Sequence, residues 1–335
     1  MIKRFSALAL TLVLSCLAAL PASAARQPDP KTMTGDIRWA SASMGSTGQV
    51  LLTGVTTIVR KAAPKLRLSV MTTSGSIENP RLMESKECDF AAVNSDAAYP
   101  AIKGTKPYDK PITMQTLFRT FGNTVIFIVP KNSPIQKMED LEGKRVSVGP
   151  PNSGGYNLAF SVLTHGYDLW GKIKPVYLSY NDIGAALRDG TIDASMAHLN
   201  NSIPTSYLSE IDATMDVRAI GYTKEALDRI IAAEPFQTSD ILKAGVLKNQ
   251  KEDLITMTNN NIQYARPGIP DDLVYVIVKS LFENADQLGA FHQLGKDFTV
   301  KNALFGVLKD IPVHPGAARY YKEVGVWRDD LKIAE

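Results

Sequence analysis

The amino-acid sequence predicts a two-lobed α/β protein with a ligand cleft between the lobes and a hinge of two strands. Strand-like and helix-like segments alternate along most of the 335 residues, a pattern that favours largely parallel sheets with helices on both faces. A set of polar turns recurs about a hundred residues later in the chain. Two strand-like segments, near residues 128 and 259, connect the regions that carry the two sets. Lobes whose strands end in polar turns indicate two walls of one cleft.

The recurring turns belong to an internal repeat. The Ser-x-Gly motif at residues 46–48 returns at residues 153–155, an offset of 107 residues, and each copy follows a strand-like segment. Asp89 and Asp193 each precede a short strand-like segment and match at an offset of 104 residues. The two halves are therefore expected to share one supersecondary plan.

The first 24 residues have the features of a secretory signal peptide. Lys3 and Arg4 precede an apolar run over residues 5–20, and small residues follow at 22–24 (Ala-Ser-Ala). The run is too short and wrongly flanked for a lasting membrane span. We expect cleavage after Ala24 and localisation in the periplasm. The alternative is a lipoprotein signal that uses Cys16.

Composition and charge exclude several classes of partner. With 44% hydrophobic and 21% charged residues, the chain is typical of a soluble globular protein. Removal of Lys3 and Arg4 with the leader lowers the formal net charge from +3 to +1, which gives no reason to expect nucleic acid or an anionic membrane surface. Cys88 would be the single cysteine of the exported chain, so no intramolecular disulfide is expected. We expect a monomer.

The first lobe is predicted to open with strand, helix and strand. Residues 37–41 form the first strand, residues 51–59 have apolar positions close to helical spacing, and residues 65–72 alternate as a second strand. The continuous β-branched and aromatic run at 125–129 is typical of a strand covered on both faces, and Pro130 ends it.

A second α/β unit is predicted to open with a strand at 144–149. It extends through a helix near 224–233 and a polar region at 234–253, and residues 261–265 form a strand that returns to the first lobe. A helix follows after 269–272. The expected division is a signal peptide at 1–24, a discontinuous lobe 1 made of 25–128 and 260–335, and lobe 2 at 129–259.

The common catalytic signatures are missing from the sequence. It contains no Gly-x-Ser-x-Gly elbow, no His-Glu-x-x-His, no Walker A lysine and no Gly-x-Gly-x-x-Gly. Its four histidines are scattered without metal-ligand spacing. We therefore expect a binding protein with no catalytic residues, no metal and no cofactor.

The polar turns suit the binding of an anion. A loop that ends a strand and starts a helix leaves backbone N–H groups pointing into the cleft, where the helix dipole favours negative charge. Hydroxyls add short donors, and glycines let a ligand approach the backbone closely. The expected ligand-binding residues are Ser46, Thr47, Gly48, Ser74, Gly75, Ser76, Asn94, Ser95, Asp96, Ser153, Gly154, Gly155, Tyr156, His198 and Asn200.

Several of these residues have an equally simple structural interpretation. Any one loop could consist of ordinary helix caps and turns, and its occurrence in matching places in both lobes is what favours binding. Residues 94–96 could contact ligand or cap a helix, and His198 has the same two alternatives. Tyr156 could wall the pocket or pack in the core. Arg119 could hold a carboxylate or pair with an acidic side chain.

Several sequence blocks resemble the TAXI-type solute receptors of tripartite ATP-independent periplasmic (TRAP) transporters. The resemblance extends over residues 38–327, and its most specific blocks are SGSIEN at 74–79, NSDAAY at 94–99 and HPGAARYY at 314–321. DLEGKRVSVG at 140–149 is shared by many periplasmic receptors. The resemblance implies a type II-like periplasmic binding protein fold. It also implies capture of a small organic anion (carboxylate, dicarboxylate or amino acid) and delivery to TRAP-type membrane permease subunits.

Three places depart from the usual pattern of these receptors. Tyrosines usually follow the first glycine loop, where residues 49–52 read Gln-Val-Leu-Leu, and a tyrosine is common where residues 244–247 read Ala-Gly-Val-Leu. Asn94 replaces a glutamine. If these side chains normally shape the pocket, the ligand can differ from the usual amino acid or dicarboxylate.

Other functions remain open on the sequence alone. A receptor of an ABC importer shares this fold and is distinguished by the membrane partner. A secreted enzyme would convert its ligand, and a sensor would pass the binding signal to another protein.

Overall fold

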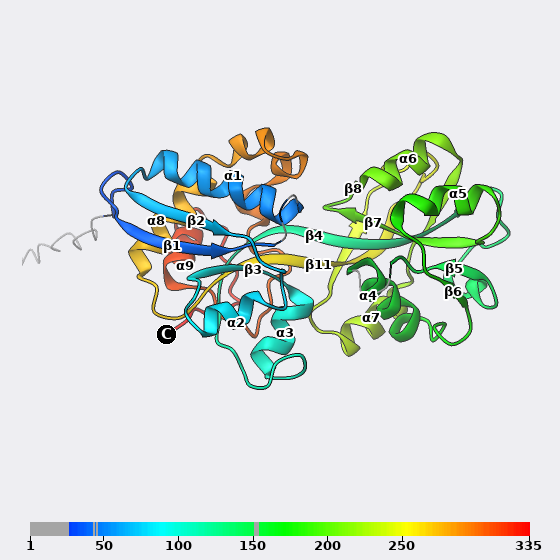
Figure 1. Ribbon diagram of the computed structural model, residues 1–335, viewed down its shortest axis with the longest axis horizontal. Coiled ribbons are helices and arrows are strands. Elements are labelled where there is room, and N and C mark those ends of the chain that lie inside the picture. The colour runs from blue at the N-terminus through cyan, green and yellow to red at the C-terminus, as the bar shows by residue number, and fades with distance from the viewer. Residues whose placement is uncertain (1–26, 43, 45, 151–153) are drawn as a thin grey trace, which may run out of the picture.

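The computed structural model describes residues 27–42, 44, 46–150 and 154–335, which form two α/β lobes connected by two long strands (Figure 1). The expected signal peptide and Ser153 lie outside the described residues. The two-lobed α/β class with a two-strand hinge, predicted from the sequence, is confirmed.

One mixed sheet runs through both lobes. Its strands are β1 (Gly35–Ala40), β2 (Leu66–Met71), β3 (Phe90–Asn94), β4 (Gln115–Pro130), β5 (Arg145–Ser147), β6 (Lys174–Val176), β7 (Ala194–Asn200), β8 (Ile203–Pro204), β9 (Val217–Ile220), β10 (Thr238–Leu242) and β11 (Leu254–Ala265). Their main order is β2-β1-β3-β11-β4-β7-β5-β6, and β8, β9 and β10 join it at β7, β4 and β11.

Helices cover this sheet in both lobes (Figure 1). The α-helices are α1 (Thr47–Ala62), α2 (Asn79–Glu84), α3 (Ser95–Lys103), α4 (Gly154–Ser161), α5 (Ile183–Arg188), α6 (Ser206–Thr214), α7 (Lys224–Ala233), α8 (Asp271–Phe282) and α9 (Pro315–Glu323). A single π-helical turn, η2 (Val162–Gly166), continues α4.

Strands β4 and β11 form the hinge. They pair antiparallel along most of their length and cross from one lobe to the other side by side (Figure 1). On β4, Leu117 and Phe118 pack in the core of lobe 1, whereas Val125 and Phe127 pack in lobe 2. The change from one core to the other therefore takes place over residues 122–124, a few residues before the expected division at 128.

The core of lobe 1 is built on the parallel strands β1, β2 and β3. Trp39 of β1 is fully buried, and its ring meets that of Phe90 edge to face with centroids 4.9 Å apart. Its indole N–H donates to Gln263 at 2.7 Å, which satisfies the polar end of the ring. Helix α1 begins where the Ser46 hydroxyl accepts a hydrogen bond from the Gln49 N–H at 3.3 Å.

The core of lobe 2 has two separate halves, one on each face of its sheet. One half includes Val146 and Met196, and the other includes Ile126 and Leu208. Residues of β4 alternate between the halves because successive side chains of a strand point to opposite faces. The continuous apolar run at 125–129 is thus buried on both sides, as predicted.

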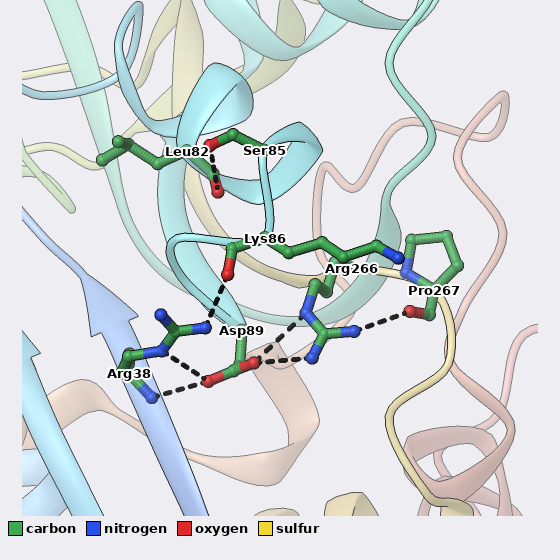
Figure 2. A network of polar contacts seen from close by, with 7 residues as sticks. All are labelled: Arg38, Leu82, Ser85, Lys86, Asp89, Arg266 and Pro267. Atoms are coloured by element: carbon green, nitrogen blue, oxygen red, sulfur yellow. Dashed lines mark hydrogen bonds and ion pairs between the residues drawn. The ribbon is translucent and has the colours of Figure 1, made fainter.

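The two halves of the internal repeat form equivalent Asp–Arg ion pairs. Asp89 lies just before β3 and binds Arg38 of the neighbouring β1, with the Arg38 N–H donating to its carboxylate at 2.9 Å (Figure 2). Asp193 lies just before β7 and accepts from the Arg145 N–H of β5 at 2.8 Å. The matching offsets in the sequence therefore correspond to matching contacts in the two lobes.

Two segments differ from the sequence expectation. Strand β4 begins at Gln115, ten residues before the apolar run that predicts it. Its first half contains polar side chains such as Thr116 and Thr120, which are buried inside the sheet and bonded to backbone carbonyls. The region described from the sequence only as polar, 234–253, contains a strand, β10, which pairs with β11.

Candidate ligand-binding cleft

A cavity of about 230 Å³ lies between the lobes beside the hinge. Its walls come from the start of α3 in lobe 1, from α4 and β7 in lobe 2, and from both hinge strands. A neighbouring cavity of about 290 Å³ shares three of its residues and reaches Glu234 and Phe236. The first of these two, called the cleft cavity below, is lined by Asn94, Asp96, Asn123, Gly155, Leu158, Tyr180, His198 and Asn259.

Asp96 is the acidic group of this cavity. It is the second residue of α3, and backbone N–H groups at the start of that helix bind its carboxylate. Burial raises the pKa of Asp96 above its ordinary value and the Glu234 carboxylate adds to the rise, although the Ala97 N–H and the Asn259 side chain act in the opposite direction. The protein's own carboxylate therefore occupies the anion position at this helix start.

His198 contributes a neutral ring. Its ring packs against the rings of Tyr180 and Tyr207, with centroids 4.8 Å and 5.3 Å away, and the Tyr207 hydroxyl lies 3.0 Å from Nδ1. Burial lowers the pKa of His198 to about 4, so the imidazole is uncharged near neutral pH. Asp96 is then the one acidic residue among the described residues that line the cavity.

Three consecutive asparagines of β11 divide between the two faces of the hinge. Asn259 faces the cleft cavity, and its buried Oδ1 has no hydrogen-bond partner among the described residues. Asn261 donates to the Asn94 side chain at 2.7 Å on the same side. Asn260 lies between them and instead accepts from Arg119 at 2.5 Å. The two-residue period of a strand separates these roles.

Comparison with known proteins assigns the chain to a family. Residues 39–325 match the NMT1-like family. The chain belongs to this family.

Solved structures with a similar fold include transporter binding proteins. The NMT1-like protein is 17% identical to the periplasmic aliphatic sulphonate binding protein SsuA from Escherichia coli, over 87% of this chain and 84% of that one, with a TM-score of 0.44. A Listeria monocytogenes protein described as an L-cystine ABC transporter is 14% identical over 79% and 98%, with a TM-score of 0.41. The substrate binding protein of an amino acid ABC transporter is 13% identical over 78% and 98%, with a TM-score of 0.39.

These similarities are too low to carry a ligand or a membrane partner from those proteins to this NMT1-like protein. None of the three names a TRAP transporter. In the part of the chain that the structure describes, no helix has the length and apolarity needed to cross a membrane. The same residues contain no cluster of histidine, cysteine or acidic side chains arranged to hold a metal ion.

Four of the residues expected to bind ligand line the cleft cavity of this NMT1-like protein. They are Asn94, Asp96, Gly155 and His198. Ser76 supports one of them, because its hydroxyl accepts from the Asn94 N–H at 3.0 Å. Residues expected to bind ligand therefore line the cavity from both lobes. Lobe 1 provides them at the β3–α3 junction, and lobe 2 provides them on α4 and β7.

Other expected residues have contacts of their own. The Ser46 hydroxyl caps α1, which Thr47 and Gly48 begin, and both the N–H and the hydroxyl of Ser74 donate to Glu78 at 2.7 Å. Gly75 has a φ of 108°, a conformation that glycine adopts without strain. Gly154 begins α4, and Asn200 ends β7 with a buried Oδ1 that has no partner among the described residues.

Two expectations disagree with the structure. Ser95 is fully buried, and its hydroxyl donates to the Asn260 carbonyl at 3.2 Å, so it is closed to a ligand. Tyr156 is absent from the residues that line the cavity, and its partly buried ring packs in an aromatic cluster, 5.8 Å from the ring of Trp170. In both cases the rotation of the helix decides which residue next to a polar turn lines the cavity.

Sequence reasoning missed Tyr180 and the hinge asparagines Asn123 and Asn259. Tyr180 lies in a polar turn (Tyr-Asn-Asp, residues 180–182), but nothing in its residue type separates a pocket wall from a core aromatic. The asparagines carry a usable signal, since a run of three is unusual within a strand. Gly155 fits tightly beside Tyr180: a Cβ there would lie 2.7 Å from the Tyr180 hydroxyl and 2.6 Å from the Met196 methyl.

Proposed function

We propose that this protein is an extracytoplasmic solute-binding receptor that holds a small polar solute between its lobes and delivers it to a membrane importer. The observation that carries the proposal is the cleft cavity, whose walls come from both lobes and from both hinge strands. A ligand that contacts both lobes binds the closed form better than the open form, and this difference is what drives closure. Export by the leader at residues 1–24 is part of the same proposal.

The solute that fits the cavity best carries an amino group. Asp96 supplies negative charge, and Asn259 supplies a buried acceptor that is 3% exposed and unpartnered among the described residues. An ammonium group would satisfy both. Among the carboxylates, dicarboxylates and amino acids expected from the sequence, these groups favour an amino acid, whose carboxylate would rely on backbone N–H donors near the start of α4.

The class of importer has two alternatives. The blocks at 74–79 and 314–321 resemble TAXI-type receptors and favour TRAP permease subunits. The matched structures that name a transporter name the ABC class, so the ABC alternative agrees better with the comparisons. Uptake by membrane vesicles loaded with the purified receptor separates them, because an ABC importer requires ATP and a TRAP permease requires an ion gradient.

Calorimetric titration of the purified protein with a panel of amino acids, dicarboxylates and neutral sugars tests the receptor function. We expect saturable binding of at least one amino acid at one site per chain, with the compound recovered unchanged. Asp96→Asn should weaken that binding about ten-fold or more, because it removes a charge-assisted hydrogen bond. Binding of none of the panel, or conversion of the bound compound to a product, would contradict the proposal.

A further inference from the structure

Arg119 is a buried cation outside the ligand cleft. It lies on β4 with 8% of its surface exposed. Its Nε donates to the Asn260 side chain at 2.5 Å, and its Nη2 donates to the Asn201 side chain at 2.7 Å. Both hydrogen-bond partners are neutral amides. Sequence analysis left open a carboxylate ligand or an acidic partner, and the nearby Asp240 acts on Arg119 through its charge, with no hydrogen bond between the two side chains among the described residues.

A buried guanidinium with no carboxylate hydrogen-bonded to it is costly. Burial lowers the pKa of Arg119 to about 10, which still leaves the group charged near neutral pH. Charges taken out of water are normally paired or fully hydrogen-bonded. A guanidinium has five N–H donors, of which the two amide bonds use two. The remaining donors include the end-on pair that fits two oxygens of one oxyanion.

Arg119 faces a cavity of about 440 Å³ on the other side of the hinge. Lobe 1 contributes Arg119 together with the helical turns η5 (Gln293–Asp297) and η6 (Val300–Asn302), and lobe 2 contributes the β7–β8 turn and β10. The cavity shares no lining residue with the cleft cavity. The lining residues are Arg119, Asn201, Ser202, Asp240, Lys296, Thr299, Asn302 and Phe305.

The charges of this cavity leave an excess of one positive charge. Arg119 and Lys296 are cations, and Asp240 is the one acidic residue in the lining. Burial raises the pKa of Asp240, whereas the Ile241 N–H and the charge of Arg119 act in the opposite direction. Phe305 covers one face of the guanidinium, with the ring centre 5.2 Å from its carbon, and so leaves the edge of the group for hydrogen bonds.

We propose that the cavity at Arg119 is a second binding site, which takes a small oxyanion such as a carboxylate or a phosphate. The oxyanion would accept from the end-on donors of Arg119 and from the Lys296 ammonium group, and Thr299 supplies a hydroxyl in the same wall. The site is separate from the cleft and does not depend on the solute that the cleft holds.

Thermal unfolding of the protein during titration with sodium malonate, and separately with sodium phosphate, tests this site. Sodium chloride at the same ionic strength is the reference. A ligand of the folded state stabilises it by RT ln(1 + [L]/Kd), so we expect the melting temperature to rise beyond that with chloride, and to rise with the logarithm of the anion concentration once this exceeds Kd. The fit gives the anion concentration of half occupancy, which is the midpoint. A rise with malonate alone identifies a carboxylate site, and a rise with phosphate alone a phosphate site. No rise beyond that with chloride for either anion would overturn the proposal.

Two variants locate the response. Arg119→Met should raise the midpoint anion concentration about ten-fold or more, the effect of losing charge-assisted hydrogen bonds. Lys296→Gln should raise it by a smaller factor and, because Lys296 is exposed, should leave the fold intact even if Arg119→Met does not fold. Lys301→Gln is the matched control, since Lys301 is exposed and outside the lining, and its midpoint should not move.

The outcome also separates this site from the cleft. Asp96→Asn should leave the anion midpoint unchanged, whatever it does to amino acid binding. An anion response that survives Lys296→Gln and Arg119→Met unchanged, or one that Asp96→Asn abolishes, means general salt stabilisation or binding in the cleft, and either result overturns the second site. Failure of the receptor function would appear only in the amino acid titration.

Discussion

Asp89 and Asp193 occupy equivalent positions in the two lobes, each exchanging backbone hydrogen bonds with an arginine of the adjacent parallel strand. The Asp89 N–H donates to the Arg38 carbonyl at 2.8 Å, and the Asp193 N–H donates to the Arg145 carbonyl at 2.8 Å. The carboxylates accept in return from the N–H groups of the same arginines. Each aspartate thus fixes the register at the start of the strand that ends in the cleft.

The two aspartates differ in their surroundings. In lobe 1, Arg266 also donates to the Asp89 carboxylate, at 2.8 Å from Nη2, where β11 has returned to the lobe (Figure 2). The Asp89 side chain is 7% exposed, whereas that of Asp193 is 31% exposed. The same motif is therefore a three-residue network around a buried carboxylate in one lobe and a half-exposed pair in the other.

We expect Asp89→Asn to destabilise the protein far more than Asp193→Asn. Removing the buried Asp89 carboxylate leaves Arg38 and Arg266 without their counter-ion, and because water partly solvates both arginines the loss is about 2 kcal/mol. The more exposed Asp193 pair contributes less, because water screens it. Urea unfolding of both variants measures the difference. Equal losses of unfolding free energy in the two variants would show that the deeper burial of Asp89 does not increase its contribution to stability.

The stability contributed by Asp193 should disappear in acid. The hydrogen bond and charge of Arg145 lower the pKa of Asp193 below its ordinary value, against a smaller effect of burial. A carboxyl with a lowered folded-state pKa contributes stability above its unfolded value of about 3.9, and this is lost as pH falls through the folded-state value. The difference in unfolding free energy between wild type and Asp193→Asn should therefore shrink below about pH 4. A difference independent of pH would contradict this.

The sequence predicted the fold because its strands and helices carry clear local patterns. The run at 125–129 and the spaced apolar positions at 51–59 both form the elements that they indicate. The first half of β4 could not be predicted in this way. Its polar side chains are buried by neighbouring strands that come from distant parts of the chain, and no local pattern records that.

The candidate site was predicted in part for a similar reason. The repeat located the strand ends, and these bring Asn94, Gly155 and His198 to one cavity. Which side chain at a polar turn faces the cavity depends on the exact rotation of the helix that follows, and this is why Ser95 and Tyr156 were misassigned. The hinge asparagine Asn259 was missed because its role comes from a pairing between strands more than a hundred residues apart.

Ser46→Ala should lower stability and leave solute affinity almost unchanged. The hydroxyl caps α1 through Gln49 and is not part of the cavity lining. Loss of such a cap costs about 1 kcal/mol. Calorimetric titration beside the melting curve of the unliganded variant distinguishes the outcomes. A ten-fold weaker affinity with an unchanged melting temperature would instead make Ser46 a ligand contact.

Gly155→Ala should block the cleft cavity. The new methyl group would lie 2.7 Å from the Tyr180 hydroxyl and 2.6 Å from the Met196 methyl, so the cavity wall at Tyr180 has to rearrange around it. We expect at least about a ten-fold loss of affinity, because a displaced wall side chain removes contacts that well exceed 1.4 kcal/mol. Gly143→Ala is not a suitable control because of its φ of 73°, whereas Gly171→Ala is, since its Cβ meets no atom within 4 Å. Unchanged affinity in Gly155→Ala would place the solute elsewhere.

Solute affinity should depend on pH through Asp96. Burial raises the pKa of this carboxyl, and an ammonium group bound beside it would favour the ionised form and lower that pKa again. Binding therefore releases a proton, and affinity should fall as pH drops below the raised pKa, by up to about ten-fold per pH unit. His198 should not contribute between pH 5.5 and 8, because with a pKa of about 4 it stays neutral over that range.

Titration calorimetry at several pH values, each in two buffers with different heats of ionisation, measures both the affinity and the proton release. The Asp96→Asn variant should bind weakly with a flat pH profile and release no proton, while His198→Gln should keep the wild-type slope. An affinity that rises as pH falls would require the solute to be held as an anion by a protonated group. That result would reverse the charge assigned to the ligand while leaving the two-lobed cleft as its site.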